Sequence, residues 1–458
     1  MEIVIVLVFV LGYLAITLEH SLKIDKLIPA LLMMALAWTG VAVGLDSFTS
    51  WFDSHTSKML EGYIGFGHEE KLELLEKTLL HHFGKTCEIL IFLIGAMTIV
   101  EIIDHFNGFA TIKDFIKTNK KRTLLWIITI LAFLLSAIID NLTATIVLIT
   151  ILRKLLPDAK DRIWYAGLII IAANAGGAWS PIGDVTTTML WMGKKVTAVK
   201  LIEYLILPSF ICVGIPVLIA SFLPAFKGTF QVSADNEKRN KHGKLMLYLG
   251  LGLIVFVPVF KTITHLPPYI GMMLSLSIIS MVAEIISSRK FNITNAVDEM
   301  SNSLESAHHH KSPTFGALSK IEMPSILFFL GILMTVAALE SLGMIFTFGQ
   351  NVQATMPNDI FILLLGVGSA VIDNVPLVAA SMGMFQLPID HHIWHLIAFS
   401  AGTGGSMLII GSAAGVVAMG MERIDFMCYL KKISWLAFIG FAAGCASFML
   451  LVQLLHGI

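Results

Sequence analysis

Two short segments of the chain pair a carboxylate with an amide inside apolar sequence. Residues 136–141 (Ser-Ala-Ile-Ile-Asp-Asn) recur almost unchanged as residues 369–374 (Ser-Ala-Val-Ile-Asp-Asn), and each copy lies in the middle of a long apolar stretch. An ionised Asp at the centre of a bilayer costs about 2.5–3.5 kcal/mol on insertion scales. Because this cost arises twice, at matching positions, we expect each carboxylate to hold a cation or a proton.

The sequence around these pairs supplies oxygen ligands and no basic group. No Lys or Arg occurs in either apolar core or in residues 167–190 and 397–420. Carboxylate, amide, hydroxyl and free carbonyl oxygens bind hard cations, whereas an anion would favour a basic residue. This pattern predicts a sodium site. Its expected direct ligands are Asp140, Asn141, Asp373 and Asn374, and the other expected sodium-binding residues are Ser136, Thr143, Asn174, Thr186, Thr187, Ser369 and Ser406.

A buried carboxyl group can alternate between a proton and a cation. Desolvation favours its protonated form, and a neighbouring cation favours its charged form. We therefore expect Asp140 and Asp373 to be the leading proton/sodium switches and Asp184 to be a third, whose counterpart in the second copy is the uncharged Ser412. A structural alternative stays open, because Asp and Asn also cap helix N-termini and the glycine pairs nearby could be packing contacts.

The composition indicates the environment in which these residues work. The 458 residues are 56% hydrophobic and 14% charged, with a mean hydropathy of +0.82, whereas soluble proteins keep about 25% charged residues. Apolar runs of roughly 20 residues can cross a hydrocarbon core of roughly 30 Å. The net charge of −1 gives no reason to expect a nucleic-acid partner. We find no enzyme or cofactor motif and expect a membrane protein that is not an enzyme and has no cofactor.

An internal repeat extends beyond the Asp-Asn pairs. Residues 176–183 (Gly-Gly-Ala-Trp-Ser-Pro-Ile-Gly) find a counterpart in residues 404–411 (Gly-Gly-Ser-Met-Leu-Ile-Ile-Gly). Each unit therefore contains a helix, an apolar stretch with a polar break, a glycine-broken helix and a further helix. An apolar stretch that is interrupted at mid-depth fits a re-entrant hairpin with a buried tip, and repeats with interrupted helices are typical of secondary transporters.

We predict an all-α polytopic membrane protein, an inverted-repeat transporter with two re-entrant helical hairpins and two broken helices. An odd number of full crossings between the two units inverts the second one. The predicted segments are 1–86 (N-terminal scaffold helices and an external connection with a helix at 69–82), 87–226 (first repeat, with a hairpin at 123–156 and a broken helix at 162–193), 227–322 (linking helices and a cytoplasmic loop) and 323–458 (second repeat, with a hairpin at 359–386 and a broken helix at 393–420). The other crossings are expected near 3–18, 27–45, 87–105, 201–224, 244–260, 268–287, 323–347 and 427–455.

Charge distribution predicts the orientation. In this arrangement most of the 31 Lys and Arg residues fall on one side, which the positive-inside rule assigns to the cytoplasm. We therefore expect an inner-membrane protein with both termini outside. Glu101 and Glu340 are expected near membrane ends, where they snorkel or pair with neighbours, and a functional role is the alternative. The histidine clusters at 81–82, 308–310 and 391–392 are expected in solvated loops, with pH sensing as the alternative.

Residues 136–145 (Ser-Ala-Ile-Ile-Asp-Asn-Leu-Thr-Ala-Thr) and 174–187 (Asn-Ala-Gly-Gly-Ala-Trp-Ser-Pro-Ile-Gly-Asp-Val-Thr-Thr) resemble the NhaD-type sodium/proton antiporters. That family belongs to the ion transporter superfamily, alongside citrate, dicarboxylate and arsenite carriers, and the resemblance covers nearly the whole chain. It implies exchange of Na⁺ and Li⁺ for H⁺ by a homodimer whose transport domain moves as an elevator. At its hairpin tips the chain has Ile-Asp-Asn where dicarboxylate relatives have Ser-Asn-Thr, which favours cation exchange. A sodium-coupled symporter of a small carboxylate or another anion stays the alternative.

Overall fold

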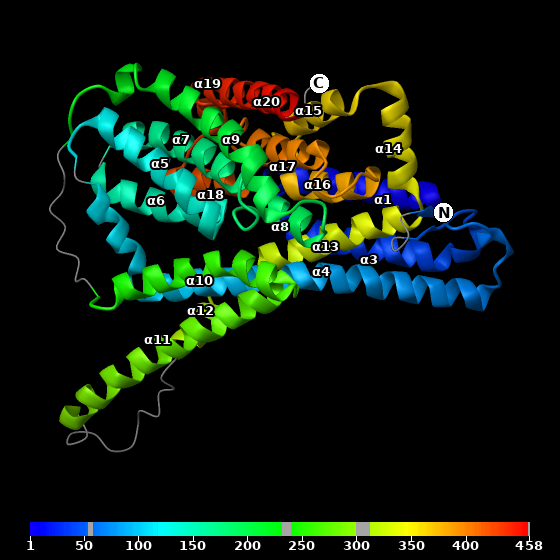
Figure 1. Cartoon of the computed structure of the whole chain (residues 1–458), viewed down its shortest axis with the longest axis horizontal. Helices are drawn as coiled ribbons and strands as arrows, with labels where there is room; N and C mark the ends of the chain where they lie inside the picture. The colour runs from blue at the N-terminus through cyan, green and yellow to red at the C-terminus, as the bar shows by residue number, and fades with distance from the viewer. Residues whose placement is uncertain (54–57, 117, 157, 231–239, 299–311, 457–458) are drawn as a thin grey trace. The chain divides into compact units, whose positions relative to one another are not determined.

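The protein is almost entirely helical. A computed structural model describes residues 1–53, 58–116, 118–156, 158–230, 240–298 and 312–456 (Figure 1). The strands β1 (Phe52–Asp53) and β2 (Lys58–Met59) form one small antiparallel pair. The predicted all-α class is therefore confirmed. Short 3-10 helices are η1 (Leu45–Ser47), η2 (Tyr63–Gly65), η3 (Gly108–Phe115) and η4 (Pro224–Phe226).

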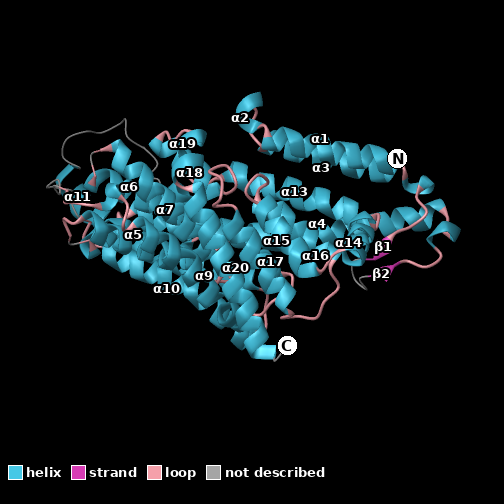
Figure 2. Cartoon of the chain, turned by 90° about the horizontal axis from the view of Figure 1, so that it is seen from above, coloured by secondary structure: helices cyan, strands magenta, loops and turns pink. Residues whose placement is uncertain are grey.

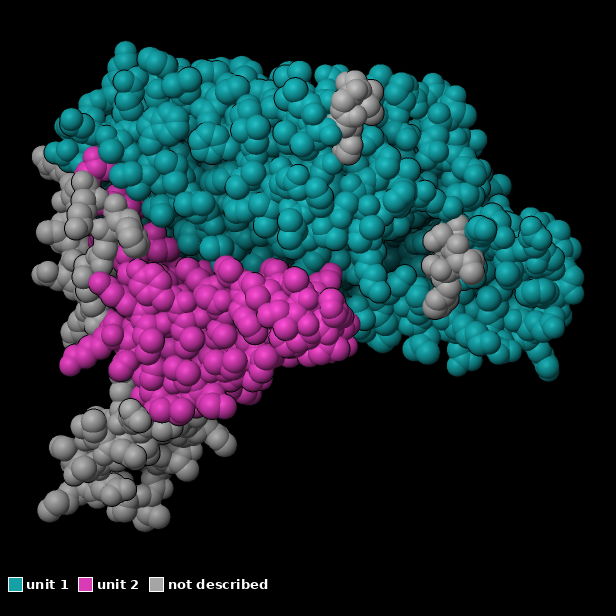
Figure 3. Space-filling model, in the orientation of Figure 1, with its two compact units in different colours: residues 1–90, 119–231, 323–458 teal, residues 91–118, 232–322 magenta. Residues whose placement is uncertain are grey.

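The chain forms two compact units, coloured separately in Figure 3. One consists of residues 1–90, 119–231 and 323–458, and the other of residues 91–118 and 232–322. Helices α10 (Gly243–Thr264), α11 (Pro268–Asp298) and α12 (Pro313–Leu318) belong to the second unit. Every predicted site residue lies in the first unit. The four segments predicted from the sequence follow the repeats rather than compactness and stay a prediction.

The N-terminal helices form a layer within the first unit. Helices α1 (Glu2–Thr17) and α3 (Leu27–Val43) run side by side, and α3 also packs on α13 (Met323–Ser341) (Figure 2). The short α2 (Glu19–Leu22) links α1 and α3. Helix α4 (His68–His105) is one continuous helix of 38 residues where we expected an external helix and a separate crossing. The two join because an isolated glycine, Gly84, does not by itself end a helix.

The first repeat has the predicted breaks. Its helices are α5 (Lys121–Ile139), α6 (Asn141–Leu155), α7 (Ala159–Ala178), α8 (Val185–Met192) and α9 (Ala198–Ala220). A single non-helical residue, Asp140, separates the packed helices α5 and α6, and residues 179–184 break the helix between α7 and α8. Helix α5, without α6, is already long and apolar enough to cross a membrane. We expected two arms that are each too short to cross. Re-entry of this hairpin stays a prediction.

The second repeat follows the same order. After α13 come α14 (Met344–Thr355), α15 (Asn358–Gly368), α16 (Asn374–Met384), α17 (His392–Gly404), α18 (Ala413–Glu422), α19 (Phe426–Lys432) and α20 (Ser434–His456). Helices α15 and α16 are the hairpin arms, and both pack on the broken helix α17. The expected crossing at 323–347 divides into α13 and α14, because Gly343 adopts a left-handed conformation (φ +71°) that ends a helix.

The described helices fit a polytopic membrane protein. Seven of them are long and apolar enough to cross a bilayer, namely α4, α5, α9, α10, α11 over Pro268–Ser287, α13 and α20. Shorter apolar helices include α1, α3, α15, α16 and α18. By length alone, the structure thus supports fewer full crossings than the sequence windows suggested.

Candidate ion-binding site

Equivalent glycines bring each broken helix onto the first arm of its hairpin. A Cβ atom on Gly176 of α7 would lie 2.3 Å from the carbonyl oxygen of Phe133 in α5. A Cβ atom on Gly404 of α17 would lie 2.0 Å from the carbonyl oxygen of Gly366 in α15. Only glycine permits backbones to approach so closely. The repeat seen in the sequence is therefore also a repeat of packing.

The same glycine pairs also shape the breaks in the helices. A Cβ atom on Gly177 would lie 2.6 Å from the carbonyl oxygen of Gly183, and one on Gly405 would lie 2.5 Å from that of Gly411. Each break thus folds back on the end of its own helix. The two interpretations left open by the sequence, unwinding and close packing, are both correct, and neighbouring glycines divide the two roles.

Ser136 and Ser369 fasten the hairpins to the broken helices. The Ser136 hydroxyl donates to the carbonyl oxygen of Ala173 at 2.5 Å, and the Ser369 hydroxyl donates to that of Ala401 at 2.7 Å. Both serines are fully buried. These matching bonds fix the height of each hairpin tip beside the break in the adjacent helix.

The second half of each broken helix packs on the opposite repeat. Helix α8 contacts α16 and α17, and helix α18 contacts α6 and α7. At the far end of α18 the buried Glu422 carboxylate accepts hydrogen bonds from Arg153 of α6 at 2.7 Å and from Arg162 of α7 at 2.8 Å. The two repeats therefore share one polar interface, and ion pairs join the two repeats at its edge.

Asp184 is the most buried carboxylate of the predicted set, and both repeats contact it. It occupies the N-cap position of α8 and is 4% exposed. Its Oδ2 atom accepts a hydrogen bond from the Thr186 hydroxyl at 2.9 Å and another from Asn374 Nδ2, across the interface, at 3.0 Å. Among the described residues, Asp184 takes part in no ion pair. A carboxylate held only by neutral donors can accept a cation or a proton.

A series of side-chain hydrogen bonds crosses the interface beside Asp184. Asn141 Nδ2 donates to Asn174 Oδ1 at 3.1 Å, and Asn174 Nδ2 donates to the Ser412 hydroxyl at 3.0 Å. All three residues are buried. Ser412, which we expected only as the uncharged counterpart of Asp184, is therefore part of this network, and its repeat position was the signal that could have identified it.

Asp140 behaves as the structural alternative predicted. Its Oδ1 atom accepts from the backbone N–H of Thr143 at 2.8 Å and its Oδ2 atom accepts from the Thr143 hydroxyl at 2.9 Å, so the side chain caps α6. Its backbone has φ +86° and ψ 159°, a conformation that L-residues rarely adopt. Capping does not remove the charge, and the Asp140 carboxylate also repels that of Asp184.

Asp373 corrects the expectation that these carboxylates have no basic neighbour. Lys26 Nζ, at the N-terminal end of α3, lies 3.3 Å from Asp373 Oδ2. No side-chain cap bond is formed at the N-terminus of α16. The sequence around Asp373 does not predict this pair, because the lysine comes from the N-terminal layer.

The four expected direct sodium ligands separate into two kinds. Asn141 and Asn374 bond within the repeat interface, whereas Asp140 and Asp373 bond outside it. No three His, Cys, Asp or Glu side chains in the described part of the chain lie close enough together to hold a metal ion.

Two of the other expected ligands bond to nearby backbone. The Thr187 hydroxyl donates to the carbonyl oxygen of Asp184 at 2.9 Å, and the Ser406 hydroxyl donates to that of Thr403 at 2.6 Å. Both side chains are buried. They therefore brace the breaks in the two helices, and the sodium-ligand assignment itself stays a prediction.

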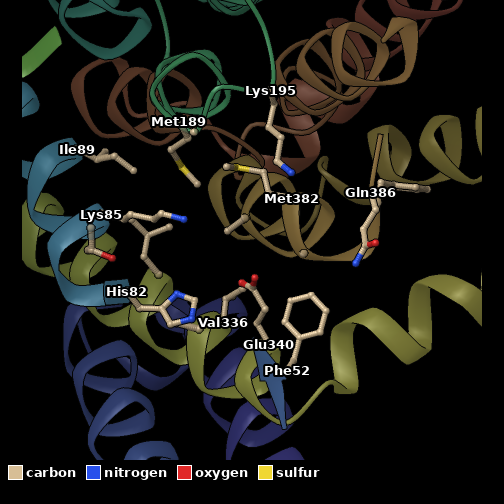
Figure 4. A pocket seen from close by; sticks show the side chains of 17 residues that line it. Phe52, His82, Lys85, Ile89, Met189, Lys195, Val336, Glu340, Met382 and Gln386 are labelled. Carbon is tan, nitrogen blue, oxygen red and sulfur yellow. The ribbon is translucent and has the colours of Figure 1, made fainter. Parts of the chain in front are cut away.

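Glu340 lines a separate cavity of about 280 Å³. Lys85 of α4, Lys195 after α8 and Glu340 of α13 reach this cavity from three elements, together with the buried His82 (Figure 4). His82 is therefore not in a solvated loop as expected. The cluster at 308–310 lies outside the described residues.

Comparison with known proteins shows which family the chain resembles. Residues 13–396 match the family model described as citrate transporter. Sodium/proton antiporter 1 of Arabidopsis thaliana is 41% identical over 98% of this chain and 72% of its own length. Na(+)/H(+) antiporter NhaD of Alkalimonas amylolytica is 30% identical over 97% of this chain and 89% of its own length.

A solved structure supports the fold. The YdaH transporter of Alcanivorax borkumensis superposes with a TM-score of 0.58 at 13% identity, covering 94% of this chain and 98% of that one. This likeness concerns the fold alone. The resemblance to the NhaD-type antiporters noted in the sequence is confirmed, and the chain belongs to the family of membrane transporters whose model is described as citrate transporter.

Proposed function

We propose that this protein exchanges Na⁺ for H⁺ across a membrane and that Asp184 is its principal exchange site. The observation that carries the proposal is a 4% exposed carboxylate that receives hydrogen bonds only from neutral donors, Thr186 and Asn374, one from each repeat. The relatives named as sodium/proton antiporters support the choice of ions.

The chemistry of exchange follows from burial. An uncompensated charge in a low-dielectric surrounding is costly, so a buried carboxylate needs either a proton or a cation. Both ligands bring one positive charge to the same oxygen atoms, and the occupancy of one excludes the other. Thr186 and Asn374 hold the carboxylate in place during the exchange. Because Asn374 belongs to the second hairpin, movement of this hairpin would change the site and link ion binding to alternating access.

Asp140 and Asp373 take supporting roles in this proposal. The Asp184 carboxylate interacts repulsively with both of them. Two carboxylates that each repel the Asp184 carboxylate add negative charge around it, which attracts cations toward the interface. The sequence ranked Asp140 and Asp373 first, but burial and bonding favour Asp184.

The ions carried, the motion of the hairpins and the assembly of the protein extend the proposal. We propose that Li⁺ is also carried, since oxygen ligands suit both small cations. The hairpins and broken helices would move as an elevator against the N-terminal layer, in a homodimer of the inner membrane with both termini outside. Cross-linking of the purified protein in lipid would test the dimer, and accessibility of cysteines introduced at the two ends would test the orientation.

A reconstitution experiment tests the function directly. Proteoliposomes that contain the purified protein and a trapped pH-sensitive dye are given a proton gradient and then Na⁺, Li⁺ or choline. We expect Na⁺ and Li⁺ to dissipate the gradient without any organic substrate, and choline to have no effect. The second candidate is a sodium-coupled carboxylate symporter, which the description of the family model as citrate transporter favours. It predicts no response until a carboxylate such as citrate is added.

A further inference from the structure

Lys26 connects the N-terminal layer to the tip of the second hairpin. Its Nζ atom lies 3.3 Å from Asp373 Oδ2 and 4.5 Å from the ring centroid of Phe328 in α13. The side chains of Lys26 and Asp373 are 25% and 17% exposed, so the protein does not fully enclose the pair. The ammonium group thus has two partners within a short distance, a carboxylate and an aromatic face.

Two consecutive residues of the hairpin tip face different partners. Asp373 faces the N-terminal layer, where Tyr13 of α1 also interacts with it electrostatically. Asn374 faces the repeat interface and donates to Asp184. Any change in the partner of Asp373 can therefore be transmitted to Asp184 through one peptide unit.

The Lys26–Asp373 pair differs from the structural ion pairs of this protein. The Glu422 carboxylate is 1% exposed, and two arginines bind it at 2.7 and 2.8 Å. The contact of Lys26 with Asp373 is longer, at 3.3 Å, and runs through a flexible stem. A lysine ammonium is a compact point charge rather than a bidentate fork. A longer contact that the protein does not fully enclose can open, whereas the arginine clamp on the enclosed Glu422 holds the fold.

We propose that Lys26 is a resident counter-cation of Asp373 that an incoming Na⁺ displaces, an inference that rests on the proposed sodium/proton exchange. Lys26 and Na⁺ carry the same charge and seek the same carboxylate oxygen, so both cannot neutralise Asp373 at once. The Phe328 ring offers the displaced ammonium a cation–π contact. Lys26 is thus a positioning residue that sets the apparent affinity for Na⁺, and breaking its contact removes one tie between the hairpin tip and the N-terminal layer.

Substitutions of Lys26 should shift the apparent KM for Na⁺ in opposite directions. In Lys26→Gln we expect a KM about three- to tenfold lower than in the wild type, which corresponds to about 0.6–1.4 kcal/mol. In Lys26→Arg we expect a KM at least about twofold higher, because a guanidinium binds a carboxylate in a fork and is harder to displace. Lys23→Gln removes the same charge from an exposed position nearby and should leave KM unchanged.

The measurement is the initial rate of Na⁺-driven proton movement in proteoliposomes as a function of Na⁺ concentration. A merely structural lysine would lower the maximal rate in both variants without shifting KM in opposite directions. An unchanged or higher KM in Lys26→Gln, in a wild type that exchanges ions, overturns the inference alone. Absence of exchange in the wild type overturns the proposed function instead. Should Lys26→Gln fail to fold, an unchanged or lower KM in Lys26→Arg refutes the inference, and a higher KM supports it.

Discussion

Replacing Gly404 by Ala tests whether the broken helices must touch the hairpins. The new methyl group would lie 2.0 Å from the carbonyl oxygen of Gly366, and its next nearest atoms also belong to that residue's backbone. Ordinary contact begins at 3.4 Å, so α15 and α17 would have to separate by 3.4 − 2.0 = 1.4 Å. No side chain can rotate away to relieve this contact. The hairpin that carries Asn374 would move with α15.

The expected loss of stability follows from overpacking. Inserting atoms into a well-packed core costs about 1–3 kcal/mol or more, which lowers the melting temperature by about 2–10 °C in a larger domain. Gly420→Ala in α18 is the matched control, because a Cβ atom there has no neighbour within 4 Å. That variant should be neutral or slightly stabilised, since Ala favours a helix over Gly by about 0.5–1 kcal/mol.

Thermal unfolding of the purified variants in detergent provides the assay. The buried Trp394 of α17 supplies an intrinsic fluorescence signal close to the substitution. Gly176→Ala, the equivalent change in the first repeat, should behave like Gly404→Ala, because its Cβ atom would lie 2.3 Å from a backbone oxygen. Equal melting temperatures for Gly404→Ala and Gly420→Ala would refute the close-approach argument.

Three further predictions concern the interface between the repeats. Glu422→Gln leaves two arginines facing a neutral side chain and should cost about 3–5 kcal/mol in thermal unfolding; a melting temperature within error of the wild type would contradict the assignment of this clamp. Ser412→Ala removes the acceptor of Asn174 and the cap of α18, and should cost about 1–2 kcal/mol by the same assay, an expectation that an unchanged stability would refute. NaCl, compared with choline chloride, should raise the melting temperature of the wild type, because Na⁺ at a hundredfold excess over its dissociation constant adds about 2.7 kcal/mol to the free energy of unfolding. The same salt should not stabilise Asp184→Asn, and an equal gain in both proteins would place sodium elsewhere.

Local features of the sequence predicted the breaks in the helices well. The Asp-Asn pairs and the glycine-rich motifs act through turns and close approach, which depend on a few adjacent residues. The break at Asp140 and the interruption after Ala178 therefore lie where expected. The repeat also predicted that Ser136 and Ser369 would be equivalent, and they make matching hydrogen bonds.

Contacts between distant segments could not be predicted in the same way. Nothing near Asp373 indicates Lys26, and nothing near Glu422 indicates the two arginines that bind it, because each pair depends on packing of complete helices. Hydropathy windows likewise divided α4 and merged α13 with α14, since average hydrophobicity does not register a helix that continues into polar sequence or a single left-handed glycine. The sequence therefore predicted which types of residue form the site. It did not predict which distant residues contact them.

We propose above that Asp184, held by neutral hydrogen-bond donors, exchanges Na⁺ for H⁺. The most direct test compares sodium-driven proton movement in proteoliposomes that contain wild type, Asp184→Asn or Asp104→Asn, the last of which removes an exposed carboxylate. We expect Asp184→Asn to be as inactive as empty liposomes and Asp104→Asn to match the wild type. Exchange by Asp184→Asn at the wild-type rate would contradict the role proposed for Asp184.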